Sequence, residues 1–271
     1  MLLGCVFATT NADAARFLYT GGHPADVARA AALGDTFTEF SPNDSGWSTA
    51  LSGGYGSFDA FVVGENNGYS SISPSTKSAI AAYVNGGGKV IIVGDHNGST
   101  EFLNPVFGYS AVASYGCDSE QTVAGSKTAT TVGTNFASGP PQLHNLSCTG
   151  ALVTSTLPAA AKTMYAGSGT SLVFTAAYGS GQVGYLGWDL CGEAEDGGCG
   201  NVTAYEDDWY IVLHAALIPS FTSCAASGYL GSQLILCKKI CEQPQSPVTL
   251  AGLLKIYKAA YRSTPSCAAA Q

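Results

Sequence analysis

The sequence predicts an α/β protein built around a mostly parallel sheet. Short apolar runs alternate with helical stretches along the chain, which is the pattern of strands joined by crossover helices. The 271 residues are 46% hydrophobic, enough to bury a sizeable core, and this excludes fibrous and disordered proteins. Only 11% of the residues are charged and the net charge is −8, so the composition also argues against nucleic-acid binding.

The first two-thirds of the chain contain the predicted βαβ pattern. Residues 17–22 form an apolar run that ends in glycines, and an alanine-rich helical stretch follows at 24–33. Residues 58–64 are typical of a buried strand, 73–85 of a helix with Pro74 in its first turn, and 89–93 of the next strand. Two apolar strands joined by a helix predict a parallel pair with a right-handed crossover.

The later part of the chain predicts a less regular arrangement. Residues 110–156 are rich in Ser, Thr and Gly and have no helical period, so we expect short strands and loops beside the sheet. Residues 172–178 and 183–189 predict two strands joined by a glycine-containing hairpin turn, and 207–217 predict a helix that packs on the sheet.

The C-terminal tail differs from the rest of the chain in charge. From residue 224 onward there are five basic residues and one acid, Glu242, so the tail carries +4 and the remainder −12. Residues 249–262 predict an amphipathic helix that packs on a neighbouring segment; the alternative is a membrane-surface or partner-binding helix. We therefore predict an α/β domain at 15–220 and a basic, disulfide-stapled helical unit at 221–271.

The start of the chain indicates export. Residues 2–8 are apolar and residues 12–14 fit a small-x-small cleavage site, so 1–14 are predicted to be a signal peptide of a secreted or periplasmic protein. The alternative is a lipoprotein anchored at Cys5, because residues 2–5 resemble a lipobox. No other stretch is long and apolar enough to predict a transmembrane segment.

Cysteine usage supports the same compartment. Setting Cys5 apart from the nine cysteines leaves an even set of eight, which predicts disulfides in an exported chain. Eight cysteines allow 105 pairings, so the connectivity stays open. Zinc is disfavoured because there is no CxxC pair and the four histidines are scattered. The eight are Cys117, Cys148, Cys191, Cys199, Cys224, Cys237, Cys241 and Cys267.

Candidate site residues follow the ends of the predicted strands. In a parallel α/β sheet, functional groups gather at the carboxyl edge. There the chain offers Gly21, Gly22, Glu65, Asn66, Asn67, Asp95, His96, Asn97, Trp188 and Asp189. Residues 94–98 have the glycine spacing of a nucleophile elbow, with His96 at its centre.

Four segments of the chain carry a resemblance: FDAFVVG, AAYVNGGGKVIIVGDHNG, AAYGSGQVGYLGWD and DDWYIVLHAAL. Together and in this order they resemble the class I glutamine amidotransferase-like superfamily, in particular its extracytoplasmic, ThuA-like branch without amidotransferase activity. The resemblance covers about residues 16–219 and implies a flavodoxin-like three-layer sandwich. Active amidotransferases have a Cys at the elbow and a His-x-Glu pair after a later strand. Here His96 and Trp188-Asp189 stand at those places, so the resemblance implies no glutaminase activity.

Four functional interpretations follow. We favour a non-catalytic domain that binds a glycan or cell-surface protein at the carboxyl edge, through the glycines and asparagines there and Trp188. The alternative is a hydrolase or lyase in which His96 is the general base, oriented by Asp95 or Glu65 and assisted by Asp189. A third interpretation is a metal-dependent binder with calcium as its cofactor, held by oxygen ligands from Asp189, Glu193, Glu195 and Asp196. The plainest interpretation is that these acids form a solvated loop and that residues 95–96 cap the next segment.

Overall fold

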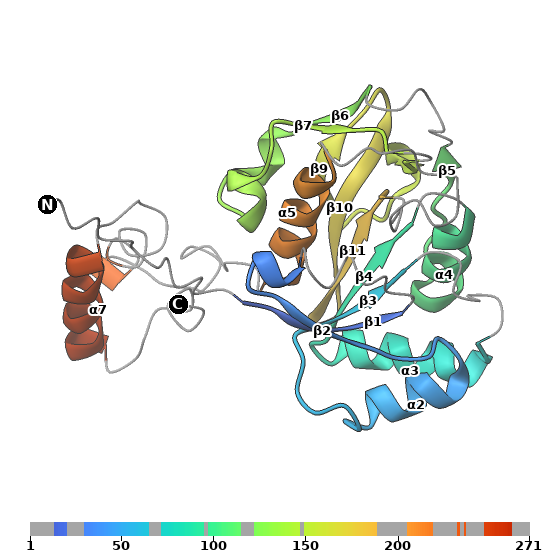
Figure 1. Cartoon of the computed structure of the whole chain (residues 1–271), viewed down its shortest axis with the longest axis horizontal. Coiled ribbons are helices and arrows are strands. Elements are labelled where there is room, and N and C mark those ends of the chain that lie inside the picture. Colours follow the sequence, from blue (N-terminus) through green and yellow to red (C-terminus); the bar gives the residue numbers. More distant parts are fainter. Residues whose placement is uncertain are drawn as a thin grey trace, which may run out of the picture. The chain divides into compact units, whose positions relative to one another are not determined.

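The computed structural model describes residues 14–20, 30–64, 72–94, 97–114, 122–146, 149–188, 205–218, 232–233, 236 and 247–261. The chain divides into two compact units, one spanning Ala15–Ser220 and the other containing the C-terminal residues from Phe221 (Figure 1). All nine cysteines lie outside the described residues, so the structure does not test the disulfide prediction. The predicted signal peptide, residues 1–14, also lies outside them except for Ala14.

The larger unit contains one mixed sheet. Five strands run parallel in the spatial order β2-β1-β3-β4-β11. They are β1 (Arg16–Thr20), β2 (Thr36–Glu39), β3 (Ala60–Val63), β4 (Lys89–Val93) and β11 (Gly181–Leu186). The strands predicted at 17–22, 58–64, 89–93 and 183–189 are thereby confirmed, with small changes at their ends.

The rest of the sheet is antiparallel, which corrects the prediction of a mostly parallel sheet. Beyond β11 the order continues β10-β9-β6-β7, and β8 pairs with both β10 and β5. Of the ten strand pairs, four are parallel and six antiparallel. The antiparallel strands are β5 (Ala113–Ser114), β6 (Val123–Lys127), β7 (Gln142–His144), β8 (Ala151–Val153), β9 (Ala161–Ala166) and β10 (Thr170–Tyr178). Strands β9, β10 and β11 follow one another through tight turns, and chain neighbours joined in this way can pair only in the antiparallel sense.

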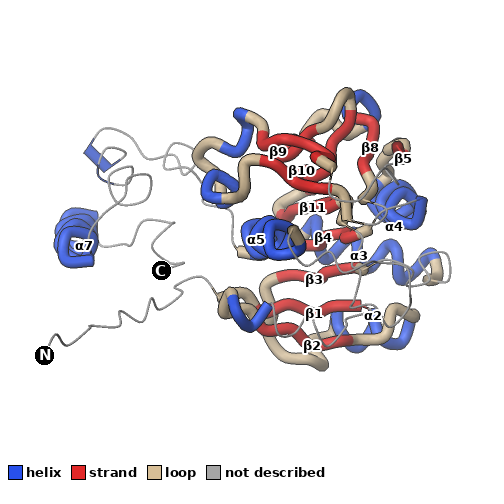
Figure 2. Tube along the Cα trace, turned by 45° about the horizontal axis from the view of Figure 1, so that its top comes forward, coloured by secondary structure: helices blue, strands red, loops and turns tan. Residues whose placement is uncertain are grey.

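Helices cover both faces of the sheet (Figure 2). They are α2 (Asp44–Leu51), α3 (Pro74–Asn85), α4 (Asn97–Phe107) and α5 (Glu206–Leu217), with short 3-10 turns at Ala129–Thr131, Asn135–Ser138 and Thr154–Thr156. The predicted helices α3 and α5 are confirmed. Ser73 caps α3, because its hydroxyl accepts a hydrogen bond from the N–H of Thr76. Neither α2 nor α4 was predicted.

Alternating side chains divide the core into two layers. Phe17 and Tyr19 of β1 pack with α5, whereas Leu18 between them packs with α2, α3 and α4. The same alternation holds along β3 and β4, because successive strand residues point to opposite faces. Among the described residues, the helices on each face thus pack against the sheet through one of these two layers.

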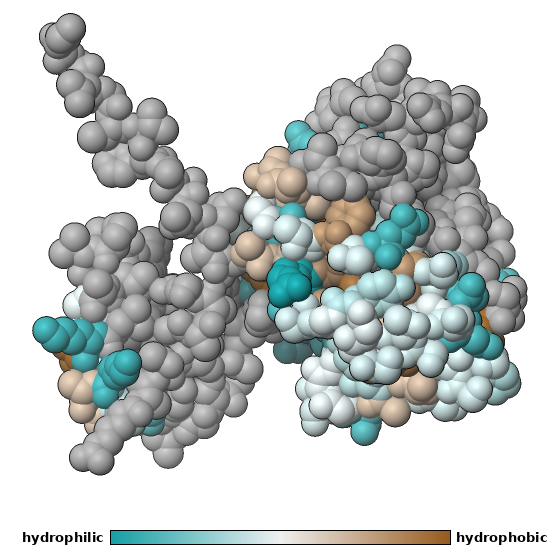
Figure 3. Space-filling model, turned by 60° about the horizontal axis from the view of Figure 1, so that its bottom comes forward, coloured by the Kyte–Doolittle hydropathy of each residue, from teal (hydrophilic) through white to brown (hydrophobic). Residues whose placement is uncertain are grey.

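The outer face of α2 and α3 has few strongly hydrophilic residues. Figure 3 shows this face as mostly pale, between the hydrophilic and hydrophobic ends of the scale. The exposed residues of the two helices are mostly Ser, Thr and Ala, with Asp44 as an exposed charged residue, which agrees with the low charge content of the chain.

The smaller unit contains α7 (Pro247–Tyr261), which confirms the helix predicted there. Tyr257 is fully buried and accepts a hydrogen bond from Gln233 (3.1 Å), and the hydroxyls of Tyr261 and Ser232 lie 2.9 Å apart. Lys255 and Lys258 are exposed. Among the described side chains of α7, Tyr257 thus points inward, whereas Lys255, Ile256 and Lys258 are exposed. Among the described residues, no helix has the length and apolarity needed to cross a membrane.

Candidate functional site

The candidate site lies at the carboxyl edge of the parallel strands. There β1 ends at Thr20, Gly64 follows β3, Gly94 follows β4 and Trp188 lies two residues beyond β11. Nearly all predicted site residues come directly after these positions and lie outside the described residues: Gly21, Gly22, Glu65, Asn66, Asn67, Asp95, His96, Asp189, Glu193, Glu195 and Asp196. The structure describes the backbone of Asn97, which begins α4, and places Trp188 fully.

Two neighbouring strand ends are tied together at this edge. The hydroxyl of Thr20 accepts a hydrogen bond from the backbone N–H of Gly64 at 3.0 Å, and Thr20 is fully buried. A Cβ on Gly64 would lie 2.6 Å from the carbonyl oxygen of Thr20, so only glycine fits. The backbone that leads into residues 65–67 is therefore held close to the end of β1.

At the β4–α4 junction a strand is followed by a helix after a short connection. Strand β4 ends at Val93 and α4 begins at Asn97, so only three residues separate them. The hydroxyl of Tyr185 donates to the carbonyl of Gly94 at 3.2 Å, which fixes the entry to the turn. In the first turn of α4, the Ser99 hydroxyl is buried and has no hydrogen-bond partner among the described residues.

Trp188 corrects the prediction that it forms a ligand-stacking surface. It is only 2% exposed, because its ring stacks on Trp209 (centroids 6.3 Å apart) and meets the edge of Tyr210 (4.6 Å). A ring packed between two aromatic side chains of α5 belongs to the core. Trp188 therefore anchors α5 to the end of β11 and offers no face to a ligand.

A polar hollow of about 220 Å³ opens at the same edge, beside the start of β10. Backbone hydrogen bonds hold the segments beside the hollow together. The N–H of Gly150 donates to the carbonyl of Gly187 (2.7 Å), and the N–H of Gly187 donates to the carbonyl of Leu172 (2.8 Å). None of the described residues that line it is ionisable. They are Ser114, Thr122, Val123, Ala124, Asn145, Thr149, Gly150, Ala151, Gly167, Ser168, Thr170 and Leu172.

Sequence reasoning did not assign this hollow a role. Most of its lining comes from the Ser/Thr/Gly-rich stretch at 110–156, which we interpreted as decoration of the sheet. The signal was the richness in uncharged hydrogen-bonding residues beside a predicted strand end. The stretch has no periodic pattern that would predict which of these residues come together around the hollow.

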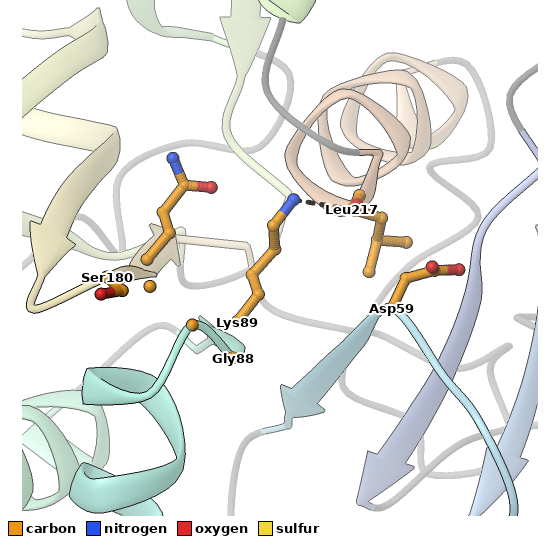
Figure 4. Close-up of a pocket in the computed structure, with 8 residues that line it drawn as sticks. Asp59, Gly88, Lys89, Ser180 and Leu217 are labelled. Atoms are coloured by element: carbon orange, nitrogen blue, oxygen red, sulfur yellow. Dashed lines mark hydrogen bonds between the residues drawn. The ribbon is translucent and has the colours of Figure 1, made fainter. Parts of the chain in front are cut away.

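A larger hollow of about 380 Å³ lies at the opposite, amino-terminal edge (Figure 4). Lys89 crosses it from the start of β4 to the end of α5, where its Nζ donates to the carbonyls of Ala216 (2.9 Å), Leu217 (2.8 Å) and Ile218 (2.8 Å). Burial lowers the pKa of Lys89 to about 8, against the attraction of Asp59. All three ammonium protons are engaged, so Lys89 caps the negative end of α5.

The described histidines serve structural contacts. His214 of α5 contacts the buried Asp35 through Nδ1 (2.8 Å), and Asp35 also accepts from the N–H of Ala15 (2.8 Å). His144 stacks on Tyr205 with the ring centroids 3.8 Å apart. Within the described ranges, no three His, Cys, Asp or Glu side chains gather as a metal site.

Comparison with known proteins gives a likeness in structure alone. No family model and no curated protein matches the sequence. The cytoplasmic protein STM1381 from Salmonella typhimurium LT2 is similar in structure (14% identity, 75% of this chain and 100% of that chain, TM-score 0.50). So are proteins described as ThuA-like from Parabacteroides merdae (15% identity, 81% and 92%, TM-score 0.46) and Bacteroides uniformis (12%, 79% and 94%, 0.44). At these identities the likeness concerns the fold.

Proposed function

We propose that the larger unit is a flavodoxin-like, ThuA-like domain of an exported protein, and that it binds an uncharged glycan at its carboxyl edge without chemical turnover. The parallel strands lie in the order second-first-third-fourth-fifth along the chain, which is the flavodoxin-like order and supports the proposed fold type. The resemblance in sequence supports the ThuA-like assignment. In such sheets ligands bind outside the carboxyl ends of the strands.

The observation that carries the binding proposal is the polar hollow beside β10. Its described lining offers hydroxyl, amide and backbone groups, which can donate to and accept from sugar hydroxyls. A charged ligand would lose its hydration there without gaining a counter-charge from those residues. An uncharged, hydroxyl-rich ligand is therefore the best chemical match.

The test fills each hollow in turn. Ser168 lies in the exposed turn before β10 and lines the carboxyl-edge hollow, and Ser180 lies in the exposed turn after β10 and lines the other one. We expect Ser168→Tyr to weaken binding in a glycan array and in solution titration by at least roughly tenfold, about 1.4 kcal/mol. Ser180→Tyr is the matched control and should bind as the wild type does. The reverse pattern would move the site to the amino-terminal edge.

The β4–α4 junction favours a second candidate, a hydrolase or lyase with His96 as general base. The short strand–turn–helix connection is the geometry in which an elbow residue is presented to a ligand. If His96 is a base, His96→Ala and His96→Gln should both lower turnover by roughly a hundredfold or more and leave affinity nearly intact. A protein that only binds will show no turnover on the glycans that it retains.

A further inference from the structure

We infer that Asn145 is the specificity-determining acceptor of the carboxyl-edge hollow, and that the ligand unit it selects is a single neutral sugar ring, one hydroxyl of which donates a hydrogen bond to Asn145 Oδ1. This inference rests on the proposed glycan binding and assigns it a residue and a ligand size. It concerns only the residues that line the hollow. It does not depend on a role for His96 or for the acids Asp189, Glu193, Glu195 and Asp196.

Asn145 is held in one orientation by its neighbours. It is only 5% exposed, its backbone N–H donates to the carbonyl of Thr122 (2.8 Å), and its Nδ2 donates to the Thr122 hydroxyl (2.8 Å). Oδ1 has no hydrogen-bond partner among the described residues, although the residue lines the hollow. A buried amide with one end engaged and an open acceptor at the other is suited to receive a hydrogen bond from a ligand.

Leu146, which follows Asn145, is tied to Thr149 by hydrogen bonds. The Thr149 hydroxyl accepts from the N–H of Leu146 (2.8 Å) and donates to the carbonyl of the same residue (3.3 Å). Thr149 is buried and uses its hydroxyl within the turn. It therefore fixes the wall of the hollow and leaves the acceptor role to Asn145.

The facing wall supplies a second polar group and an open floor. Thr170 is half-buried, and its hydroxyl makes no hydrogen bond to the described residues. A Cβ on Gly167 would lie 2.9 Å from that hydroxyl, so glycine keeps the space in front of Thr170 free. Asn145 and Thr170 thus offer two hydrogen-bonding positions within one small cavity.

The size and polarity of the hollow limit the class of ligand that it can bind. At about 220 Å³ the hollow is below the roughly 300–1,000 Å³ typical of pockets for drug-sized ligands, so it suits one ring rather than a run of linked sugars. Val123 lines it and is 48% exposed, which provides an apolar patch for the C–H face of a sugar. An open carbonyl acceptor without a described cation beside it disfavours carboxylated sugars.

The test titrates the full oxidised chain with glucose, galactose, mannose and glucuronic acid, followed by saturation-transfer NMR. We expect at least one neutral monosaccharide to bind and glucuronic acid not to bind. Asn145→Ala should lower that affinity by roughly tenfold, the loss expected for a hydrogen bond to a buried group. The matched control is Asn135→Ala, because Asn135 is also a buried amide but donates to the carbonyls of Ala215 and Ile218, outside the hollow.

The outcomes separate this inference from the proposed function. If a glycan binds, is lost in Ser168→Tyr and is retained at full affinity in Asn145→Ala, the glycan site stands and the role of Asn145 is wrong. Preference for glucuronic acid would overturn the neutral-ligand assignment, and absence of any glycan binding would overturn both. Should Asn145→Ala not fold, Thr170→Val replaces it, since it removes the facing hydroxyl at nearly constant volume and should lower affinity in the same direction.

Discussion

Thr20 and Gly64 join the carboxyl ends of β1 and β3 through a hydroxyl that accepts a backbone N–H at 3.0 Å. The chain places β2 on one side of β1, and β3, β4 and β11 on the other side. The strand order therefore reverses between β1 and β3. That reversal opens a crevice at the strand ends because consecutive crossovers leave on opposite faces. The pair therefore sets the spacing of the two strand ends that lead into residues 21–22 and 65–67.

Removing this tie should destabilise the larger unit. We expect Thr20→Val to lower the free energy of unfolding by about 1–3 kcal/mol, because it removes a buried hydrogen-bond acceptor at nearly constant shape. Thr38→Val, on the exposed side of edge strand β2, is the control and should change stability little. Urea denaturation measures both. An equal effect at the two positions would show that the Thr20 hydroxyl contributes nothing specific.

Gly64→Ala tests the same contact from the other side. The new Cβ would lie 2.6 Å from the Thr20 carbonyl and 3.0 Å from the Tyr19 hydroxyl, so the strand ends must separate. We expect a loss of stability of about 1–3 kcal/mol, the usual cost of overpacking. Gly53→Ala gives a contrast, because nothing lies within 4 Å of its Cβ position and only its positive φ of 82° opposes the change.

Lys89 should make stability depend on pH in the alkaline range. Its pKa is about 8 in the folded chain and 10.5 when unperturbed, so between these values the unfolded chain binds more protons. The contribution of Lys89 to the unfolding free energy therefore rises from pH 8 to pH 10 and is flat below pH 8. Lys89→Met should abolish this rise, which denaturation curves at pH 7, 8, 9 and 10 would detect. Parallel pH profiles of the two proteins would contradict the assignment.

Asp208 should show the opposite dependence at acid pH. Burial raises its pKa, while the nearby His144 lowers it and Asp207 raises it. Because the folded chain holds this proton more tightly than the unfolded chain, the stabilising contribution is present below the unperturbed pKa of 3.8 and is lost as pH rises through the folded value. Asp208→Asn should thus be more stable than the wild type at pH 7 and not at pH 3. Asp207→Asn is the neighbouring control in thermal unfolding at both pH values.

The eight cysteines that remain after Cys5 is set apart should form four disulfides. Reduction of the mature chain should then raise its intact mass by about eight hydrogens. Free thiols at several of these positions, detected by alkylation before reduction, would overturn both the disulfide framework and the export argument.

The sequence predicted the buried strands and long helices, and the reasons are local. Residues 60–63 and 89–93 are continuous apolar runs, and α3 begins with a Ser-Pro cap and ends in three glycines, so each signal lies within its own element. Strand β2, TFTE, was missed because an edge strand with one exposed side needs few apolar residues. Helix α4 was missed because Gly98 and Pro105 break its helical pattern.

The candidate site was predictable only as an edge of the sheet. Strand ends can be located from sequence, and the carboxyl-edge rule then selects His96 and its neighbours. The hollow around Asn145 depends on segments from four separate strands that meet only in the folded chain. Trp188 was predicted to bind a ligand because the sequence shows that it follows a strand. Its packing partners lie about twenty residues later, in α5, and the sequence does not show that contact.

Strand β11 has a consequence for how the larger unit assembles. On one side it pairs with β10 through a two-residue turn, and on the other it runs parallel to β4, whose paired residues lie 93 positions earlier in the chain. Closing a hairpin costs far less chain entropy than closing so long a loop. We therefore expect the β9–β10–β11 meander to form first and to serve as the template on which β4, and then β3 and β1, are added. A slowly refolding chain would expose the free edge of β11 before β4 arrives, and this is the edge at which two unfinished molecules would pair with each other.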